Sequence, residues 1–146
     1  MLLIEKVLVL RSSEIFQNMQ ESDLVELAAI VEEMYLDAGK LLFSKGEVGN
    51  SMYFIYSGSV KIHDGEHVLA VLGENEIVGE LSILDSESRS ASATTEEDSI
   101  LLKLEQEAFY DIMLNNADVL KGILKTLCKR LRIINKKSIS MANRNT

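Results

Sequence analysis

Between positions 41 and 104 the chain consists of short runs of β-branched and aromatic residues, each bounded by turn-forming residues. Such runs predict the strands of an antiparallel β structure, because successive side chains of a strand point to opposite faces. The turn signal is clearest at Asp64-Gly65, a pair that suits the positive φ angles of a tight hairpin. Residues 46–50 predict another reversal. The predicted strands are 41–44, 52–57, 59–63, 67–72, 90–95 and 99–104.

Helical periodicity flanks this β segment on both sides. Leu24, Leu27 and Val31 lie on one apolar stripe, and Asp23 with Glu26 forms a plausible capping pair at the start of that helix. The helical period returns after position 104 and continues to about 135, whereas residues 138–146 are polar and are expected to fray. The expected order is helices over about 1–38, an antiparallel β-barrel over about 39–104 and C-terminal helices over about 105–137.

The length and composition suit a single domain of mainly β class with flanking helices (α+β), spanning residues 1–146. At 146 residues, with 47% hydrophobic and 26% charged residues, the chain is typical of one globular domain. No apolar run approaches the roughly 20 residues of a membrane span, and the single cysteine favours a reducing compartment. We therefore expect a cytoplasmic protein, or the cytoplasmic part of a larger, membrane-attached one.

Charge is distributed unevenly along the chain. Residues 1–120 contain 7 basic and 23 acidic groups, whereas residues 121–146 contain 8 basic groups and no acidic one. An acidic body repels phosphate backbones, so direct DNA binding by this chain is not expected. The basic end is consistent with a solvated helix face or with contact to an anionic surface.

An apolar seam with alternating steps of four and three residues runs along the predicted C-terminal helix. It covers barely two heptads, which is short for a coiled coil on its own. The seam suits packing on the β body and the interface of a homodimer equally well. Its members are Leu120, Leu124, Leu127, Leu131 and Ile134.

The segment 77–91 does not follow the strand alternation and contains the groups that are suited to binding a ligand. Gly79 allows the backbone to approach a ligand closely, and a short helical turn after it would offer free N–H groups to an anion. Arg89 adds a fork of donors suited to phosphate oxygens, and Ser90 adds another donor. Glu80 is itself an anion and would accept from a sugar hydroxyl. This combination indicates a nucleotide site, although Glu80 and Arg89 are also consistent with an internal ion pair.

This segment resembles the phosphate-binding cassette of cyclic nucleotide-binding domains. The matching residues are Gly79-Glu80-Leu81-Ser82-Ile83-Leu84 followed at the family's spacing by Arg89-Ser90-Ala91. Residues 46–62 resemble the family's turn and paired strands before the cassette. The resemblance covers roughly residues 12–135 and implies a barrel of the jelly-roll type, with the cassette at 78–91.

The resemblance assigns the contacts to a cyclic phosphate. It implies that backbone N–H groups of Gly79, Leu81 and Ser82 bind the phosphate, together with the Arg89 guanidinium and the N–H and hydroxyl of Ser90.

The resemblance also implies contacts to the ribose and the base. Glu80 would accept from the ribose 2′-hydroxyl, and Val78, with Val71 and Ile62 as weaker candidates, would line the base pocket. Ser88 stands where the family usually has proline, which would loosen the return to the arginine without removing a donor.

These observations together predict a non-catalytic regulatory module that binds cAMP or cGMP, needs no cofactor, and passes the signal to an unidentified effector through its C-terminal helix. The alternative is a scaffold of the same fold that has lost the ligand. A metal enzyme is disfavoured because His63 and His67 lack a spaced carboxylate partner. A DNA-binding regulator needs a helix-turn-helix after the long helix, and this chain ends before one.

Overall fold

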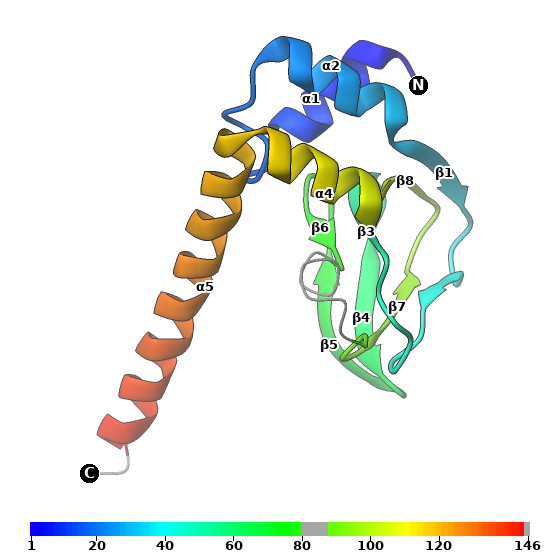
Figure 1. Cartoon of the computed structure of the whole chain (residues 1–146). Helices are drawn as coiled ribbons and strands as arrows, with labels where there is room; N and C mark the ends of the chain where they lie inside the picture. Colours follow the sequence, from blue (N-terminus) through cyan, green and yellow to red (C-terminus); the bar gives the residue numbers. More distant parts are fainter. Residues whose placement is uncertain (80–87, 145–146) are drawn as a thin grey trace.

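A computed structural model of the chain describes residues 1–79 and 88–144 (Figure 1). Helices occur at both ends of this part of the chain, and the strands lie between them. The elements are α1 (Leu3–Arg11), α2 (Glu21–Ile30), β1 (Glu32–Leu36), β2 (Leu41–Phe43), β3 (Ser51–Ser57), β4 (Val60–Asp64), β5 (His67–Leu72), β6 (Ile77–Val78), β7 (Ser92–Thr95), β8 (Ser99–Glu105), α4 (Gln106–Asn115) and α5 (Ala117–Arg144).

The strands form two antiparallel sheets of four strands each. One sheet has the order β1-β8-β3-β6 and the other has the order β2-β7-β4-β5. The predicted fold class, antiparallel strands of the jelly-roll type with N-terminal helices and a long C-terminal helix, is confirmed. Among the described strands every pairing stays within its own sheet, so the sheets form a sandwich and are not closed into the expected barrel. Closure requires edge strands long enough to pair, whereas the edge strands β6 and β2 contain only two and three residues.

The strand β3 shows how the layers are built, because both of its faces are buried. Met52 and Phe54 point into a core formed mainly with the helices, whereas Tyr53 and Ile55 point into a second core between the sheets. This alternation follows from the two-residue period of a strand. The sheet that contains β3 is therefore the middle layer, with helices on one face and the second sheet on the other.

The prediction of helix up to residue 38 is wrong at its end. The helix α2 stops at Ile30, and β1 then pairs with β8 from Glu32↔Lys103 to Leu36↔Ser99. Met34 and Leu36 pack against the core between the sheets. The spacing of Val31 and Met34 suits a helix, but Met34 and Leu36 also alternate as a strand requires, and pairing with β8 decides between the two.

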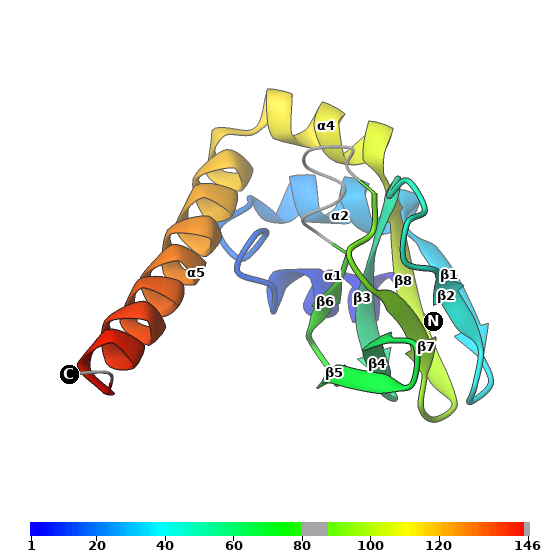
Figure 2. The ribbon, with the colours of Figure 1, turned by 90° about the horizontal axis from the view of Figure 1, so that it is seen from below.

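The helix α5 is longer than predicted and diverges from the sheets (Figures 1 and 2). It runs to Arg144, so the prediction that the chain frays from residue 138 is wrong. Among the residues of α5 whose burial is described, the buried ones lie in its first turns and include Val119 and Ile123. No helix in the described part of the chain is both long and apolar enough to span a membrane.

Candidate ligand-binding site

Gly79 lies where the chain leaves the middle sheet, directly after β6. Pairing of β6 with β3 fixes this point, with Tyr53 opposite Val78. Gly79 has a φ of +84°, and a Cβ added there would lie 2.3 Å from Nη1 of Arg89. Glycine is therefore required both by the backbone conformation and by the close approach of the arginine.

The side chain of Arg89 points into the protein rather than into solvent. It is 5% exposed, its Nη1 donates to the carbonyl oxygen of Gly79 at 3.0 Å, and its Nη2 donates to that of Ser51 at 2.6 Å. Its Cζ lies 4.1 Å from the centroid of the Phe43 ring. Two carbonyls and one ring thus hold the guanidinium in one position.

The backbone around Arg89 is tied to the reversal at residues 46–50. The N–H of Arg89 donates to the carbonyl of Glu47 at 2.6 Å, and the N–H of Gly46 donates to the carbonyl of Arg89 at 2.9 Å. A β-bridge joins Val48 to Ser88 on the same segment. The segment around Arg89 and the reversal at residues 46–50 are therefore in direct contact.

The electrostatics of Arg89 favour an anion beside it. Burial lowers the pKa of its guanidinium, while Tyr53 and Glu47 act in the opposite direction through space. The group nevertheless stays charged, because the pKa of arginine lies far above neutral pH. None of the ion pairs among the described residues includes Arg89. A buried cation is costly unless an opposite charge compensates it, and an anionic ligand would do so.

Comparison with known proteins identifies the family of this chain. The model of the family described as cyclic nucleotide-binding domain matches residues 33–116. The chain belongs to this family. The matched range of this cyclic nucleotide-binding domain includes Arg89 and the segments on both sides of it.

Relatives of this domain occur in bacteria and in eukaryotes. A CRP-like cAMP-activated global transcriptional regulator of Mycobacterium tuberculosis is 31% identical over 132 residues, which is 87% of this chain and 59% of that protein. The structure of the Thermus thermophilus catabolite activator protein superposes with a TM-score of 0.79 at 30% identity, over 89% of this chain and 63% of that one. The regulatory domain of Toxoplasma gondii PKA with cAMP gives a TM-score of 0.71 at 28% identity, over 75% and 44%. The domain thus spans about three fifths of the bacterial relatives.

The other predicted site residues of the domain lie in different surroundings. Val78 is buried in the core between the sheets, with Ile62 packed against that core, whereas Ser90 is exposed and Val71 is half exposed. Three predicted contacts, Glu80, Leu81 and Ser82, lie outside the described residues.

Sequence reasoning missed two groups that contact Arg89. Phe43 stands in a predicted strand and shows no feature that distinguishes it from a core residue. Ser51 contributes its backbone carbonyl, a group that every residue type carries. Neither contact has a sequence signal of its own.

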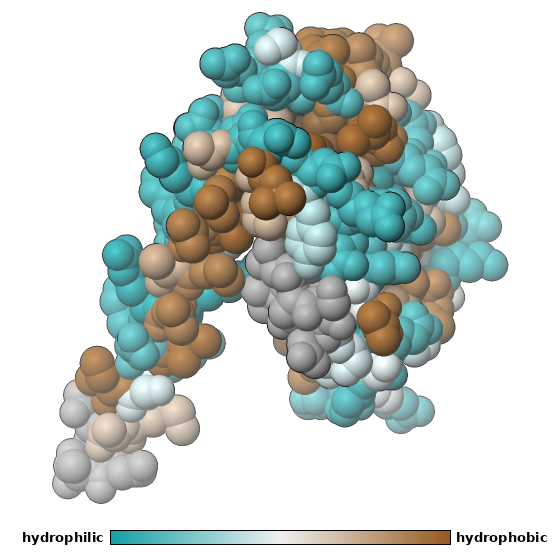
Figure 3. Space-filling model, in the orientation of Figure 1, coloured by the Kyte–Doolittle hydropathy of each residue, from teal (hydrophilic) through white to brown (hydrophobic). Residues whose placement is uncertain are grey.

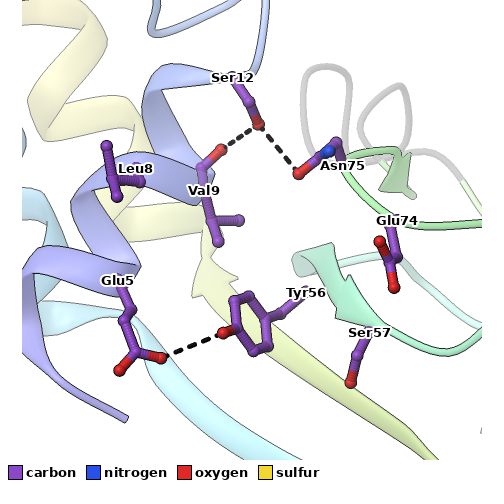
Figure 4. A pocket seen from close by; sticks show the side chains of 8 residues that line it. All are labelled: Glu5, Leu8, Val9, Ser12, Tyr56, Ser57, Glu74 and Asn75. Carbon is purple, nitrogen blue, oxygen red and sulfur yellow. Dashed lines mark hydrogen bonds between the residues drawn. The ribbon is translucent and has the colours of Figure 1, made fainter.

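A separate cavity of about 540 Å³ opens between α1, the end of β3 and the loop before β6 (Figure 4). Its walls include the carboxylates of Glu5 and Glu74, and Tyr56 donates its hydroxyl to Glu5 at 3.1 Å. Two carboxylates disfavour a phosphate. The surroundings of Arg89 are therefore the better anion site.

Proposed function

We propose that this domain is a non-catalytic regulatory module that binds a cyclic nucleotide, with the cyclic phosphate beside Arg89. The observation that carries the proposal is the buried guanidinium, which has no ion-pair partner among the described residues, in a chain of the cyclic nucleotide-binding domain family. A cyclic phosphodiester supplies one negative charge and oxygens that accept from N–H groups. The bacterial relative is named as cAMP-activated, which makes cAMP the first ligand to test and cGMP the second.

The proposed division of roles follows the cassette. Gly79, Leu81 and Ser82 bind the phosphate through backbone N–H groups, and Arg89 supplies the charge. Ser90, which follows Arg89 and is exposed, adds a further donor. Glu80 accepts from the ribose 2′-hydroxyl. Val78 is proposed for the base pocket, although its side chain is buried in the core between the sheets and would have to become accessible to contact the base.

Signal transmission is proposed to pass through α5. The helix contacts the body through its first turns, and Lys129 forms an ion pair with Glu14 in the segment between α1 and α2. A ligand shifts the position of α5 only to the extent that it binds one arrangement more tightly than another. Bound nucleotide would therefore have to favour one set of these contacts.

We also propose that α5 pairs with α5 of a second copy. Because α5 extends to Arg144, its apolar seam continues one heptad beyond Ile134, interrupted only by Ser138. A stripe of apolar side chains runs along much of α5 in the space-filling view (Figure 3). The seam comprises Leu120, Leu124, Leu127, Leu131, Ile134 and Met141, and of these only Leu127 packs against the core of its own chain.

The flanks of the seam favour a parallel pairing. In a parallel pair Arg130 lies opposite Asn135, and Lys137 lies opposite Ala142 of the second copy, so no two cations face each other. In an antiparallel pair like flanks face each other, so Arg130 would lie opposite Arg130 or Lys137 of the second copy, depending on the register. Sedimentation should show a dimer that Leu131→Glu dissociates, and a monomeric parent chain would refute the pairing.

Calorimetric titration with cAMP, cGMP and noncyclic AMP tests the nucleotide proposal. We expect saturable binding of a cyclic nucleotide and much weaker binding of noncyclic AMP. Arg89→Ala should weaken binding roughly tenfold to a hundredfold per lost bond, because hydrogen bonds to charged groups contribute about 1.5–3 kcal/mol each. The more conservative Arg89→Gln repeats the test with an amide in place of the charge.

A matched control is Arg132→Ala, which removes a cation from the exposed part of α5. It should leave nucleotide affinity unchanged. Absence of cyclic nucleotide binding in the parent chain would overturn the proposal in favour of a ligand-free scaffold. Unchanged affinity in both Arg89 variants would refute the placement of the phosphate.

A further inference from the structure

The ring of Phe43 lies against the guanidinium of Arg89 from within the sandwich. We propose that Phe43 is a positioning residue, which raises the affinity for a phosphate ligand by holding Arg89 in its binding orientation before the ligand arrives. This inference rests on the proposed nucleotide function. It assigns a part in binding to a side chain that otherwise belongs to the core.

The local structure fixes the ring itself. Phe43 is 8% exposed and stacks on Tyr53, with ring centroids 6.4 Å apart and an angle of 27° between the planes. The pairing of β2 with β7 is irregular here, since Leu41 lies opposite Thr94 and Phe43 opposite Ala93. Two residues of β2 thus span one step of β7, an irregularity that re-aims side chains. The ring of Phe43 is therefore fixed in its position.

The three contacts of the guanidinium act in different directions. The hydrogen bonds to the carbonyls of Gly79 and Ser51 hold it within its own plane. The Phe43 ring adds a cation–π contact, with Cζ 4.1 Å from the ring centroid. A long arginine side chain otherwise samples several rotamers, and each additional rotamer lowers the fraction of chains in the binding-competent one.

Removing the ring should therefore reduce affinity without removing any donor. The apparent dissociation constant increases as the fraction of chains with a competent arginine falls. A buried cation–π contact of ordinary strength corresponds to a change of roughly fivefold to thirtyfold. A purely structural role for Phe43 predicts lower stability and unchanged affinity of the folded fraction.

A double-mutant cycle separates these two roles. Cyclic nucleotide affinity is measured by calorimetry for the parent, Phe43→Leu, Arg89→Gln and the double variant, with folding checked by thermal melting. We expect Phe43→Leu to weaken binding fivefold to thirtyfold in the parent and less than twofold in the Arg89→Gln background. Phe43→Tyr keeps the aromatic face and should stay within about twofold of the parent.

The matched control is Val60→Ala, which removes buried volume from the same core at a fully buried position. It should lower the melting temperature and leave affinity unchanged. Should Phe43→Leu fold poorly, Phe43→Ile repeats the measurement.

Equal losses for Phe43→Leu in both backgrounds, or no loss in the parent, would overturn the inference while leaving the nucleotide function intact. A parent chain that binds no cyclic nucleotide would instead overturn the proposed function itself, and unchanged affinity in Arg89→Gln would refute the placement of the phosphate beside Arg89.

Discussion

The surroundings of Arg89 and the helix α5 differ in the kind of side chain that they bury or expose. Arg89 is a charged side chain that is almost fully buried, and its contacts come from segments distant in sequence. The helix α5 is a regular local element that exposes apolar side chains, with Leu131 at 60% and Ile134 at 56%. The first region is stabilised by tertiary packing, and its cation has no ion-pair partner among the described residues. The second region forms by local periodicity, and most of its apolar side chains are not covered by other parts of the chain. Each region thus indicates the kind of partner it needs.

The largest expected difference between these regions is in stability. Phe54 is buried in the helical core and contacts the Phe16 ring, so Phe54→Ala should lower the free energy of unfolding by about 3–5 kcal/mol. In the monomer Ile134→Ala on α5 should change it by no more than about 0.5 kcal/mol. Denaturant unfolding at low protein concentration measures both. Similar losses in the two variants would show that α5 and the helical core contribute alike to stability.

Two glycines with the same backbone conformation test the packing around Arg89. Gly79 and Gly39 have φ of +84° and +82°, but only at Gly79 would a Cβ meet another atom closely. Gly39→Ala should cost about 1–2 kcal/mol of stability from strain alone. Gly79→Ala should cost about 2–4 kcal/mol, because it also displaces Arg89, and it alone should weaken nucleotide binding. Equal effects on affinity would show that the close approach is unimportant.

The point where α5 meets the body gives the next test. A Cβ at Gly122 would lie 2.6 Å from the carbonyl oxygen of Ile15. Gly→Ala in a free helix normally stabilises it by roughly 0.5–1 kcal/mol, but here we expect a loss of about 1–3 kcal/mol, because the helix must move away. Thermal unfolding monitored by circular dichroism measures the sign, and a stabilised variant would show that α5 does not pack closely there.

The smallest expected effect is a pH dependence of the α5 contact. The hydrogen bond from Lys129 lowers the pKa of the Glu14 carboxyl below its ordinary value of 4.5. The contribution of this ion pair to the free energy of unfolding is therefore present above pH 4.5 and is lost as the pH falls through the lowered pKa of Glu14 in the folded state. Because the pair is largely exposed, it should contribute no more than about 1 kcal/mol.

Amide hydrogen exchange in the first turns of α5, measured between pH 6 and 3, detects this change. Glu14→Gln should remove that part of the pH dependence, whereas Glu21→Gln, a matched change on the exposed face of α2, should retain it. Retention of the full dependence in Glu14→Gln would exclude the ion pair as its cause.

Most strands were predictable because alternation is a local property. The predicted range 67–72 coincides with β5, and the ranges for β2, β3 and β8 differ from the structure by one residue at one end. The strand β1 was missed because Met34 satisfies both a helical and a strand period. The strand β6 was given no range of its own, because a strand of two residues has too few positions to alternate. The sequence could not show that the two sheets stay open rather than closing into a barrel, because closure depends on how edge strands meet.

The sequence by itself determined the order of helices and strands, the apolar seam of α5, the contrast between an acidic body and a basic end, and the residue types of the cassette. Tertiary structure alone decided that Arg89 turns inward, that the carbonyl of Ser51, 38 positions away, receives one of its hydrogen bonds, and that Phe43 lies against it. The reason is physical: periodicity and charge are carried by side chains and can be read along the chain. Backbone carbonyls are the same in every residue, so their use as acceptors depends on where folding places them.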